Sequence, residues 1–237
     1  MIRLLSVLMM FFGSQAIAAE CRLALLLGLD ISSSVDPAED RLQRGGTVAA
    51  LTAPEVQAAF FSADQPVALA VFEWSGRYNQ RVIVDWTLIS GPAALAGAAE
   101  QVAASRRSYA EFATAMGEAL DFSGDMMARA PRCLRQTIDI AGDGENNEGH
   151  GPQVSYQAAG FNKISVNGLV VANAADFQTE ERLTRFYREE VLRGPGAFLV
   201  IADGFDDYER AMRLKLVREL APAAIGALPG VIERTAG

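Results

Sequence analysis

The chain has 237 residues, half of them hydrophobic and 21% of them charged, which is enough apolar material for one sizeable core and argues against extensive disorder. Its formal net charge is -8 at pH 7. Nucleic-acid binding requires a positively charged surface, so this net charge argues against a nucleic-acid partner. The charge is compatible with binding of cations, with binding of basic surfaces, or with an acidic surface that only contacts solvent.

The first 19 residues have the pattern of a secretory signal peptide. Arg3 supplies a positive charge, residues 4–12 are apolar, and residues 16–18 form a small-x-small cleavage signal. The apolar part is shorter than the roughly 20 residues that a bilayer span needs. The pattern predicts export to the periplasm or to the exterior, no membrane insertion after cleavage, and a mature chain over residues 20–237.

Export decides how the two cysteines, Cys21 and Cys133, are interpreted. In an oxidising compartment an even number of cysteines favours a disulfide. Because Cys21 closely follows the leader, a lipoprotein is an alternative. However, Glu20 precedes it, whereas a lipidated cysteine is expected to follow a small residue. We therefore favour export as a signal-cleaved protein.

The mature chain alternates apolar runs with helical patterns. Residues 23–29 form a near-continuous apolar run, typical of a buried parallel strand covered by helices on both faces. Asp36 and Pro37 predict a helix start, with Asp as the N-cap and Pro in the first turn, and this helix runs to about residue 51. Further strands are predicted at residues 66–73, 81–86, 134–141, 164–172 and 197–202. Further helices are predicted at residues 92–104, 114–130, 153–160, 179–192 and 206–220.

The connections between these elements predict the fold. The link from 66–73 to 81–86 is shorter than the dozen or more residues that a parallel crossover needs, so these two strands form an antiparallel hairpin. The other strands alternate with helices, which is typical of the α/β class. We expect one domain over 20–237: a doubly wound, mostly parallel six-stranded sheet with one antiparallel edge hairpin and helices on both faces.

Oxygen-bearing side chains follow the carboxyl ends of the predicted strands. Asp30, Ser32 and Ser34 stand at alternate positions after the first strand, Thr114 opens a helix, and Asp143 lies just past the fourth strand. Open α/β sheets place their ligand sites at this edge. A hard divalent cation takes about six oxygen ligands. The sequence therefore predicts a cation site, most simply for Mg²⁺, with Mn²⁺ and Ca²⁺ as alternatives because their ligand preferences overlap.

With these three loops in order, the sequence resembles von Willebrand factor type A (VWA) domains and their metal-ion-dependent adhesion site. The finer resemblance is to a bacterial family of that fold, domain of unknown function 1194. The motifs that indicate it are LDISSSVD (29–36), EWSG (73–76), TAMGEAL (114–120), IDIAGDGENNEG (138–149), VNGLVV (166–171) and GPGAF (194–198). They span nearly all of the mature chain, and they imply a Rossmann-like VWA fold.

The resemblance also implies a role for each site residue. Ser32, Ser34 and Thr114 would contact the metal directly, while Asp30 and Asp143 would act mainly through bound water or indirect hydrogen bonds. The remaining coordination position would take a carboxylate from a protein partner. The physical chemistry agrees, because neutral hydroxyls donate less charge than carboxylates do and leave the cation electrophilic.

In VWA domains the first strand lies beside the strand that carries Asp143, and this order gives the cysteines a partner. Cys21 precedes Asp30 by 9 residues and Cys133 precedes Asp143 by 10. If the two aspartates lie side by side at one end of the strands, the two cysteines therefore lie side by side at the other end. A strand spacing of about 4.8 Å lies within the Cα separation that a disulfide tolerates. The resemblance thus implies a structural disulfide between Cys21 and Cys133.

The leading hypothesis is an exported, non-enzymatic domain that binds a divalent cation and, through it, an acidic group of a protein partner. A metal-assisted hydrolase or phosphoryl-transfer enzyme is the alternative, although no nucleophile and base are evident and the sole histidine, His150, is interpreted as an exposed loop residue. A structural module without metal is a third possibility. Asn146 and Asn147 either shape their loop or form the rim of the ligand site. Nucleotide binding is disfavoured, because the glycines of residues 142–149 do not fit the dinucleotide pattern.

Overall fold

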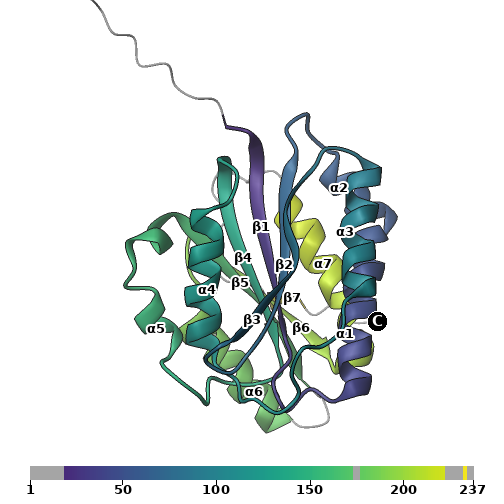
Figure 1. The fold of residues 1–237 in the computed structure, drawn as a ribbon. Coiled ribbons are helices and arrows are strands. Elements are labelled where there is room, and N and C mark those ends of the chain that lie inside the picture. Colours follow the sequence, from purple (N-terminus) through teal and green to yellow (C-terminus); the bar gives the residue numbers. More distant parts are fainter. Residues whose placement is uncertain (1–18, 173–176, 222–231, 234–237) are drawn as a thin grey trace, which may run out of the picture.

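The computed structural model describes residues 19–172, 177–221 and 232–233, which build one sheet with helices on both faces (Figure 1). The strand order is β3-β2-β1-β4-β5-β6-β7. The strands are β1 (Cys21–Asp30), β2 (Val67–Ser75), β3 (Asn79–Ile89), β4 (Cys133–Gly142), β5 (Ile164–Ala172), β6 (Leu199–Asp203) and β7 (Ile232–Glu233). Neighbouring strands are parallel except β2 and β3, which form the expected antiparallel hairpin at one edge. The predicted fold class is confirmed, and the two-residue β7 adds a seventh strand at the opposite edge.

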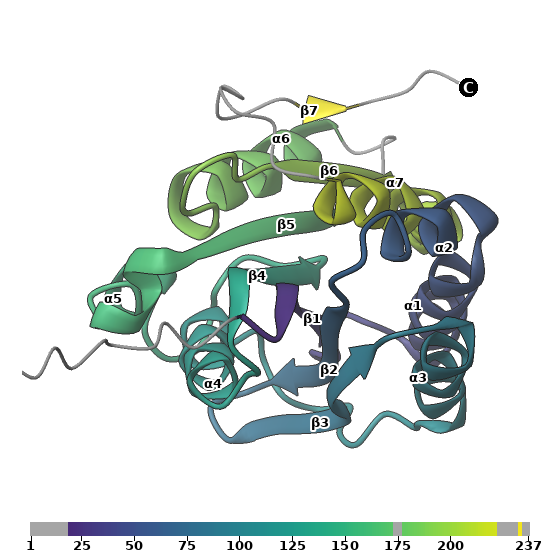
Figure 2. The same cartoon turned by 90° about the horizontal axis from the view of Figure 1, so that it is seen from above.

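The helices form two layers, one on each face of the sheet (Figure 2). They are α1 (Pro37–Thr52), α2 (Pro54–Phe60), α3 (Pro92–Ala104), α4 (Met116–Ala128), α5 (Pro152–Ser155), α6 (Phe177–Phe186) and α7 (Tyr208–Leu220). α1, α2, α3 and α7 cover one face, and α4, α5 and α6 cover the other. Within the described ranges, no helix is both long and apolar enough to cross a membrane.

Strand β1 lies at the centre of both cores, and all ten of its residues are buried. Successive side chains of a strand point to opposite faces. Leu23, Leu25 and Leu27 therefore pack under the layer of α1 and α7, while Ala24 and Leu26 pack under the layer of α4. Burial of each leucine contributes about 1.5–3 kcal/mol. The apolar run was thus correctly interpreted as a strand covered on both faces, and its rigidity fixes the position of the residues that follow it.

The helix start predicted at Asp36 is a complete capping box. The Asp36 carboxylate accepts hydrogen bonds from the backbone N–H groups of Ala38 (2.6 Å) and Glu39 (2.9 Å), and the Glu39 carboxylate accepts one from the Asp36 N–H (2.7 Å). These bonds satisfy N–H groups that the first helical turn leaves without partners. They also fix where the loop after β1 ends.

Several boundaries differ from the sequence prediction. The short helix α2 was not expected; it begins at Pro54, a residue type that suits a first helical turn. The helix predicted at 153–160 is shorter, since α5 ends at Ser155 and a 3₁₀ turn follows at Ala159–Lys163. The helix predicted at 179–192 ends in a π turn, Tyr187–Val191. The predicted signal peptide and most of the chain after residue 221 lie outside the described residues.

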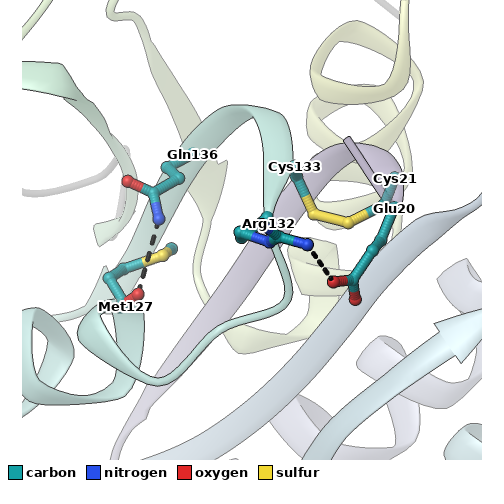
Figure 3. The surroundings of a disulfide bond; sticks show 6 residues. All are labelled: Glu20, Cys21, Met127, Arg132, Cys133 and Gln136. Atoms are coloured by element: carbon teal, nitrogen blue, oxygen red, sulfur yellow. Dashed lines mark hydrogen bonds and ion pairs between the residues drawn. A yellow bond between two sulfur atoms is a disulfide. The ribbon is translucent and has the colours of Figure 1, made fainter. Parts of the chain in front are cut away.

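The predicted disulfide between Cys21 and Cys133 is present at the end of β1 and β4 opposite the candidate site (Figure 3). The two cysteines are direct partners in the parallel pairing of these strands, and their Cα atoms are 4.4 Å apart. Beside them, the Glu20 N–H donates to the Arg132 carbonyl (2.8 Å) and the two side chains form an ion pair at 3.4 Å. The disulfide therefore joins the starts of two central strands.

A buried charged cluster links α7 to the sheet. The Lys215 ammonium, which is fully buried, lies 2.9 Å from a carboxylate oxygen of Asp139 and 3.3 Å from one of Glu219. Asn167 donates a further hydrogen bond to Glu219 (2.6 Å). Burial raises the pKa of Asp139 to about 7 in spite of the nearby lysine. One cation thus faces two carboxyl groups, and a retained proton leaves the cluster without excess charge.

Candidate metal centre

The residues predicted after β1 and β4 meet at the carboxyl edge of the sheet. Asp30 is the last residue of β1, and Asp143 directly follows β4, its parallel neighbour. The Ser34 hydroxyl donates a hydrogen bond to a carboxylate oxygen of Asp143 (2.7 Å), and the hydroxyl oxygens of Ser32 and Ser34 are 3.1 Å apart. Two loops that are 109 residues apart in sequence therefore form one polar cluster.

Asp30 is the most buried member of this cluster. One carboxylate oxygen accepts a hydrogen bond from the Ser32 N–H (2.7 Å), which turns the chain back on itself. The other oxygen, Oδ2, is buried and has no hydrogen-bond partner among the described residues, and the same holds for the hydroxyl of Tyr187. A Cβ atom at Gly142 would lie 2.8 Å from each of these two oxygens. The absence of a side chain at Gly142 therefore leaves room beside an unsatisfied carboxylate.

Thr114 contributes the third loop. Its side chain is buried, and its hydroxyl oxygen would lie 3.0 Å from a Cβ atom at Gly144, so it faces the loop that carries Asp143. The carbonyl oxygen of the Asn147 side chain accepts a hydrogen bond from the Thr114 N–H (2.8 Å), and the Asn147 N–H donates to the Thr114 carbonyl (2.9 Å). The side chain of Asn146 caps α4 through the Met116 N–H (2.8 Å). Both asparagines therefore hold the second and third loops together.

Burial and a neighbouring negative charge disfavour the ionised form of both carboxyl groups of the cluster. Burial and then the charge of Asp143 raise the pKa of Asp30 to about 8. Burial, with a further contribution from Glu39, raises the pKa of Asp143. The positive charge of Arg107 opposes both shifts without cancelling them. The site is therefore short of positive charge, and a bound cation would favour the ionised form of both carboxyls.

Two residues near the site were not identified from the sequence. Arg107 donates hydrogen bonds to the carbonyls of Ile31 (2.8 Å), Ser32 (2.7 Å) and Val35 (2.5 Å), so its guanidinium holds the loop after β1 in place. Tyr187 places its hydroxyl beside Asp30 from the π turn. Two adjacent arginines in a polar loop were the only signal for the first. An aromatic residue in an amphipathic helix gave no signal for the second.

The donors of the cluster fit a hard cation. Hydroxyl and carboxylate oxygens are the ligands that Mg²⁺, Ca²⁺ and Mn²⁺ prefer. In the described ranges, no three His, Cys, Asp or Glu side chains gather into a group that would hold a metal, so metal binding at this edge would depend on hydroxyls. A cation held by Ser32, Ser34 and Thr114 would offer a coordination position to an anionic oxygen of a ligand.

His150 does not have the exposed loop environment that was expected. It is partly buried, with Nε2 3.0 Å from the Ser155 hydroxyl and 3.2 Å from an Asp121 carboxylate oxygen, and with Nδ1 3.4 Å from Glu118. His150 is partly buried because its ring lies among polar side chains of α4 and α5. The Ser155 hydroxyl is buried and donates a hydrogen bond to the Gly117 carbonyl (2.8 Å). His150 and Ser155 therefore link α4 to α5.

The sheet order, the two helical layers and the convergence of three loops define a VWA-like α/β domain. More specifically, the chain belongs to the family described as protein of unknown function (DUF1194), whose model matches residues 20–224. The resemblance seen in the sequence is therefore confirmed. No curated protein matches the chain.

Solved structures with this fold include three of different origin. A von Willebrand factor type A protein from Catenulispora acidiphila has a TM-score of 0.58 and 14% identity over 84% of this chain and 43% of its own. Proximal thread matrix protein 1 from the mussel byssus, with a zinc-occupied MIDAS motif, has a TM-score of 0.56 and 11% identity over 84% and 48%. The pilus adhesin SpaC from Lactobacillus rhamnosus GG has a TM-score of 0.60 and 12% identity over 87% and 31%. The matches cover less than half of each of these chains, and at these identities they show the fold alone.

Proposed function

We propose that this chain is an exported domain that binds a divalent cation, most simply Mg²⁺, and through it an acidic group of a protein partner. Ser32, Ser34 and Thr114 would contact the cation, and Asp30 and Asp143 would hold it through water or neighbouring hydroxyls. The observation that supports this most is the Asp30 carboxylate: it is fully buried, one of its oxygens has no hydrogen-bond partner among the described residues, and a second carboxylate lies in the same cluster.

The composition of the ligand set supports an anionic partner. Three of the five proposed side chains are neutral hydroxyls, which neutralise little of a divalent charge. A carboxylate from outside the chain would complete the coordination. The zinc-occupied MIDAS motif of the mussel protein supports the presence of a cation in this fold, and the pilus adhesin SpaC supports a role in adhesion.

Exposed aromatic side chains next to the cluster support a protein as the partner. Tyr78, at the tip of the hairpin between β2 and β3, is 89% exposed, and Tyr109 packs edge-on against Phe112 while remaining exposed. The Gly76 N–H donates to the Ala113 carbonyl (2.7 Å), so the hairpin tip is joined to the loop that carries the third ligand. Aromatic residues are enriched at protein interfaces.

Cation binding is tested by thermal unfolding of the mature domain in chelator and after addition of Mg²⁺ or Mn²⁺. We expect the wild type to be stabilised and the Asp30→Ala variant to lose that stabilisation. Because Asp30 is buried, Thr114→Val is the second variant, since it removes the hydroxyl and keeps the side-chain shape. Asp125→Asn, an exposed change on α4, is the matched control. An equal cation-induced shift in Asp30→Ala and wild type would falsify the proposed centre.

Partner binding is tested by affinity capture from a periplasmic extract, with and without chelator, using the wild type and Thr114→Val. We expect a protein that is retained only with the cation and only by the wild type. Mutation of acidic residues in that protein should then release it. Retention of the same protein in the presence of chelator and by Thr114→Val would contradict cation-mediated binding.

The enzymatic alternative has its own test. Turnover of a panel of phosphate esters by the wild type, lost in Ser32→Ala, would favour a metal-assisted hydrolase over a binding domain. Export is tested separately, because the N-terminal sequence of the protein recovered outside the cytoplasm should begin at residue 19 or 20.

A further inference from the structure

A cavity rich in arginine lies beside the candidate metal centre. It has a volume of about 620 Å³ and lies between α1 and the loop after α3. Four arginines, Arg41, Arg44, Arg106 and Arg107, line it together with a single carboxylate, Asp40, and the rest of the wall is small or apolar apart from a serine. Small-molecule sites commonly measure about 300–1,000 Å³ and combine apolar walls with a few polar groups. Such a concentration of positive charge is unexpected in a chain of net charge -8.

Two of these arginines are used within the protein. Arg44 is buried, contacts Asp40 at 3.0 Å and contacts Glu73, a fully buried carboxylate below the cavity, at 2.5 Å. The one carboxylate of the cavity wall is thus already paired. Arg107 is held by the three carbonyls of the loop after β1. These contacts fix the floor of the cavity.

The other two arginines are available to a ligand. Arg41 extends from α1 and Arg106 from the loop opposite, and both are exposed. Among the residues that the structure describes, neither guanidinium has a hydrogen bond or an ion pair with a neighbour. A second hollow of about 500 Å³ shares Ser105 and Arg106 with this cavity and is also lined by Arg81 and by the buried Glu73. Guanidinium groups bind carboxylates and phosphates through two parallel hydrogen bonds.

We propose that this cavity binds a small organic anion, a carboxylate or a phosphate ester with an apolar body, between Arg41 and Arg106. The apolar wall, which includes Val48 and Ala110, would contact the body of the ligand, and the two arginines would bind its charged group. This cavity lies beside the cation centre and prefers ligands of the opposite charge. Arg107 connects the two sites, because it lines the cavity and also donates a hydrogen bond to the carbonyl of Ser32.

Isothermal titration calorimetry of the mature domain with phenyl phosphate and with benzoate tests the site, and benzyl alcohol is the neutral control. The titrations are done in chelator, so that anion binding is measured without a bound cation and the result does not depend on whether the proposed cation centre exists. We expect saturable binding of at least one anion, weaker at high salt, and no binding of the alcohol. The double variant Arg41→Gln/Arg106→Gln should lower the affinity for the anion about tenfold or more for each arginine removed.

The matched control is Arg188→Gln, an exposed arginine on the opposite face of the sheet, which should bind both anions as the wild type does. Thermal unfolding confirms that each variant is folded. Binding of an anion that is equal in the double variant and the wild type would overturn the proposal. So would the absence of saturable binding of either anion at millimolar concentration, or equally tight binding of the alcohol.

Discussion

Removal of the disulfide between Cys21 and Cys133 should lower the stability of the domain more than any surface change. The two residues are 112 positions apart, so the bond closes a loop that includes β1, β2, β3 and four helices. In the chain-entropy model a loop of this length corresponds to about 5 kcal/mol at 25 °C, because the cross-link removes conformations from the unfolded chain. Total stabilities of domains are about 5–15 kcal/mol, so this is a large share.

Guanidinium unfolding measures this effect in three samples: the oxidised wild type, the reduced wild type, and Cys21→Ala/Cys133→Ala. The reduced wild type keeps both sulfur atoms, so it separates the cross-link from the packing of the fully buried Cys21 side chain. We expect the midpoint to fall in both altered samples and the denaturant slope to rise, since the unfolded chain expands without the bond. A loss of less than about 1 kcal/mol in the reduced wild type would refute the entropic reasoning.

Three further predictions concern buried groups and the site loops. Lys215→Met should cost about 3–5 kcal/mol in denaturant unfolding because it leaves the buried Asp139 and Glu219 carboxyls without their cation, and Lys215→Met/Asp139→Leu/Glu219→Gln should recover most of the loss; equal stability of the two variants would contradict this. Asp139 has a pKa of about 7 when folded against an ordinary 3.8, so it contributes stability that is fully present below pH 3.8 and is lost as pH rises through 7. In chelator, Asp139→Asn should therefore flatten the stability profile by up to about 1.4 kcal/mol per pH unit in that window, and an unchanged slope would exclude this residue as its cause. Gly142→Ala should abolish the Mn²⁺-induced rise in melting temperature, because its Cβ would lie 2.8 Å from a buried carboxylate oxygen, whereas Gly97→Ala in α3, with no neighbour within 4 Å, should add about 0.5–1 kcal/mol of stability and leave the Mn²⁺ response intact.

Much of the fold follows from local patterns in the sequence. The apolar run after Cys21, the capping box at Asp36 and the short link within the β2 and β3 hairpin each specify an element from adjacent residues alone. What the sequence did not indicate depends on tertiary contacts. The π turn at Tyr187–Val191 places an aromatic hydroxyl beside Asp30, and β7 pairs with β6 over only two residues. Neither has a local signal, because the same residues would suit an ordinary helix end or a loop.

The candidate site shows the same division. Asp30, Ser34 and Asp143 were predicted from their positions after strands, and the hydrogen bond between Ser34 and Asp143 brings two of those loops together. The identity and charge of the ligands are local properties and can be predicted. The role of Arg107 cannot, because its three acceptors are backbone carbonyls more than 70 residues away, and any sequence presents carbonyls at every position.

The register of β1 against β4 connects the disulfide to the candidate site. The pairing places Cys21 opposite Cys133 and, eight residues further on, Leu29 opposite Ala141, so that Asp30 and Asp143 reach the edge nearly together. A slip by one residue would turn every side chain of β1 to the other face and exchange its two cores. The apolar side chains of β1 on both faces therefore oppose such a slip even without the covalent bond. It follows that the disulfide stabilises the folded state against unfolding, while the alignment of the two site loops is already specified by the burial of β1.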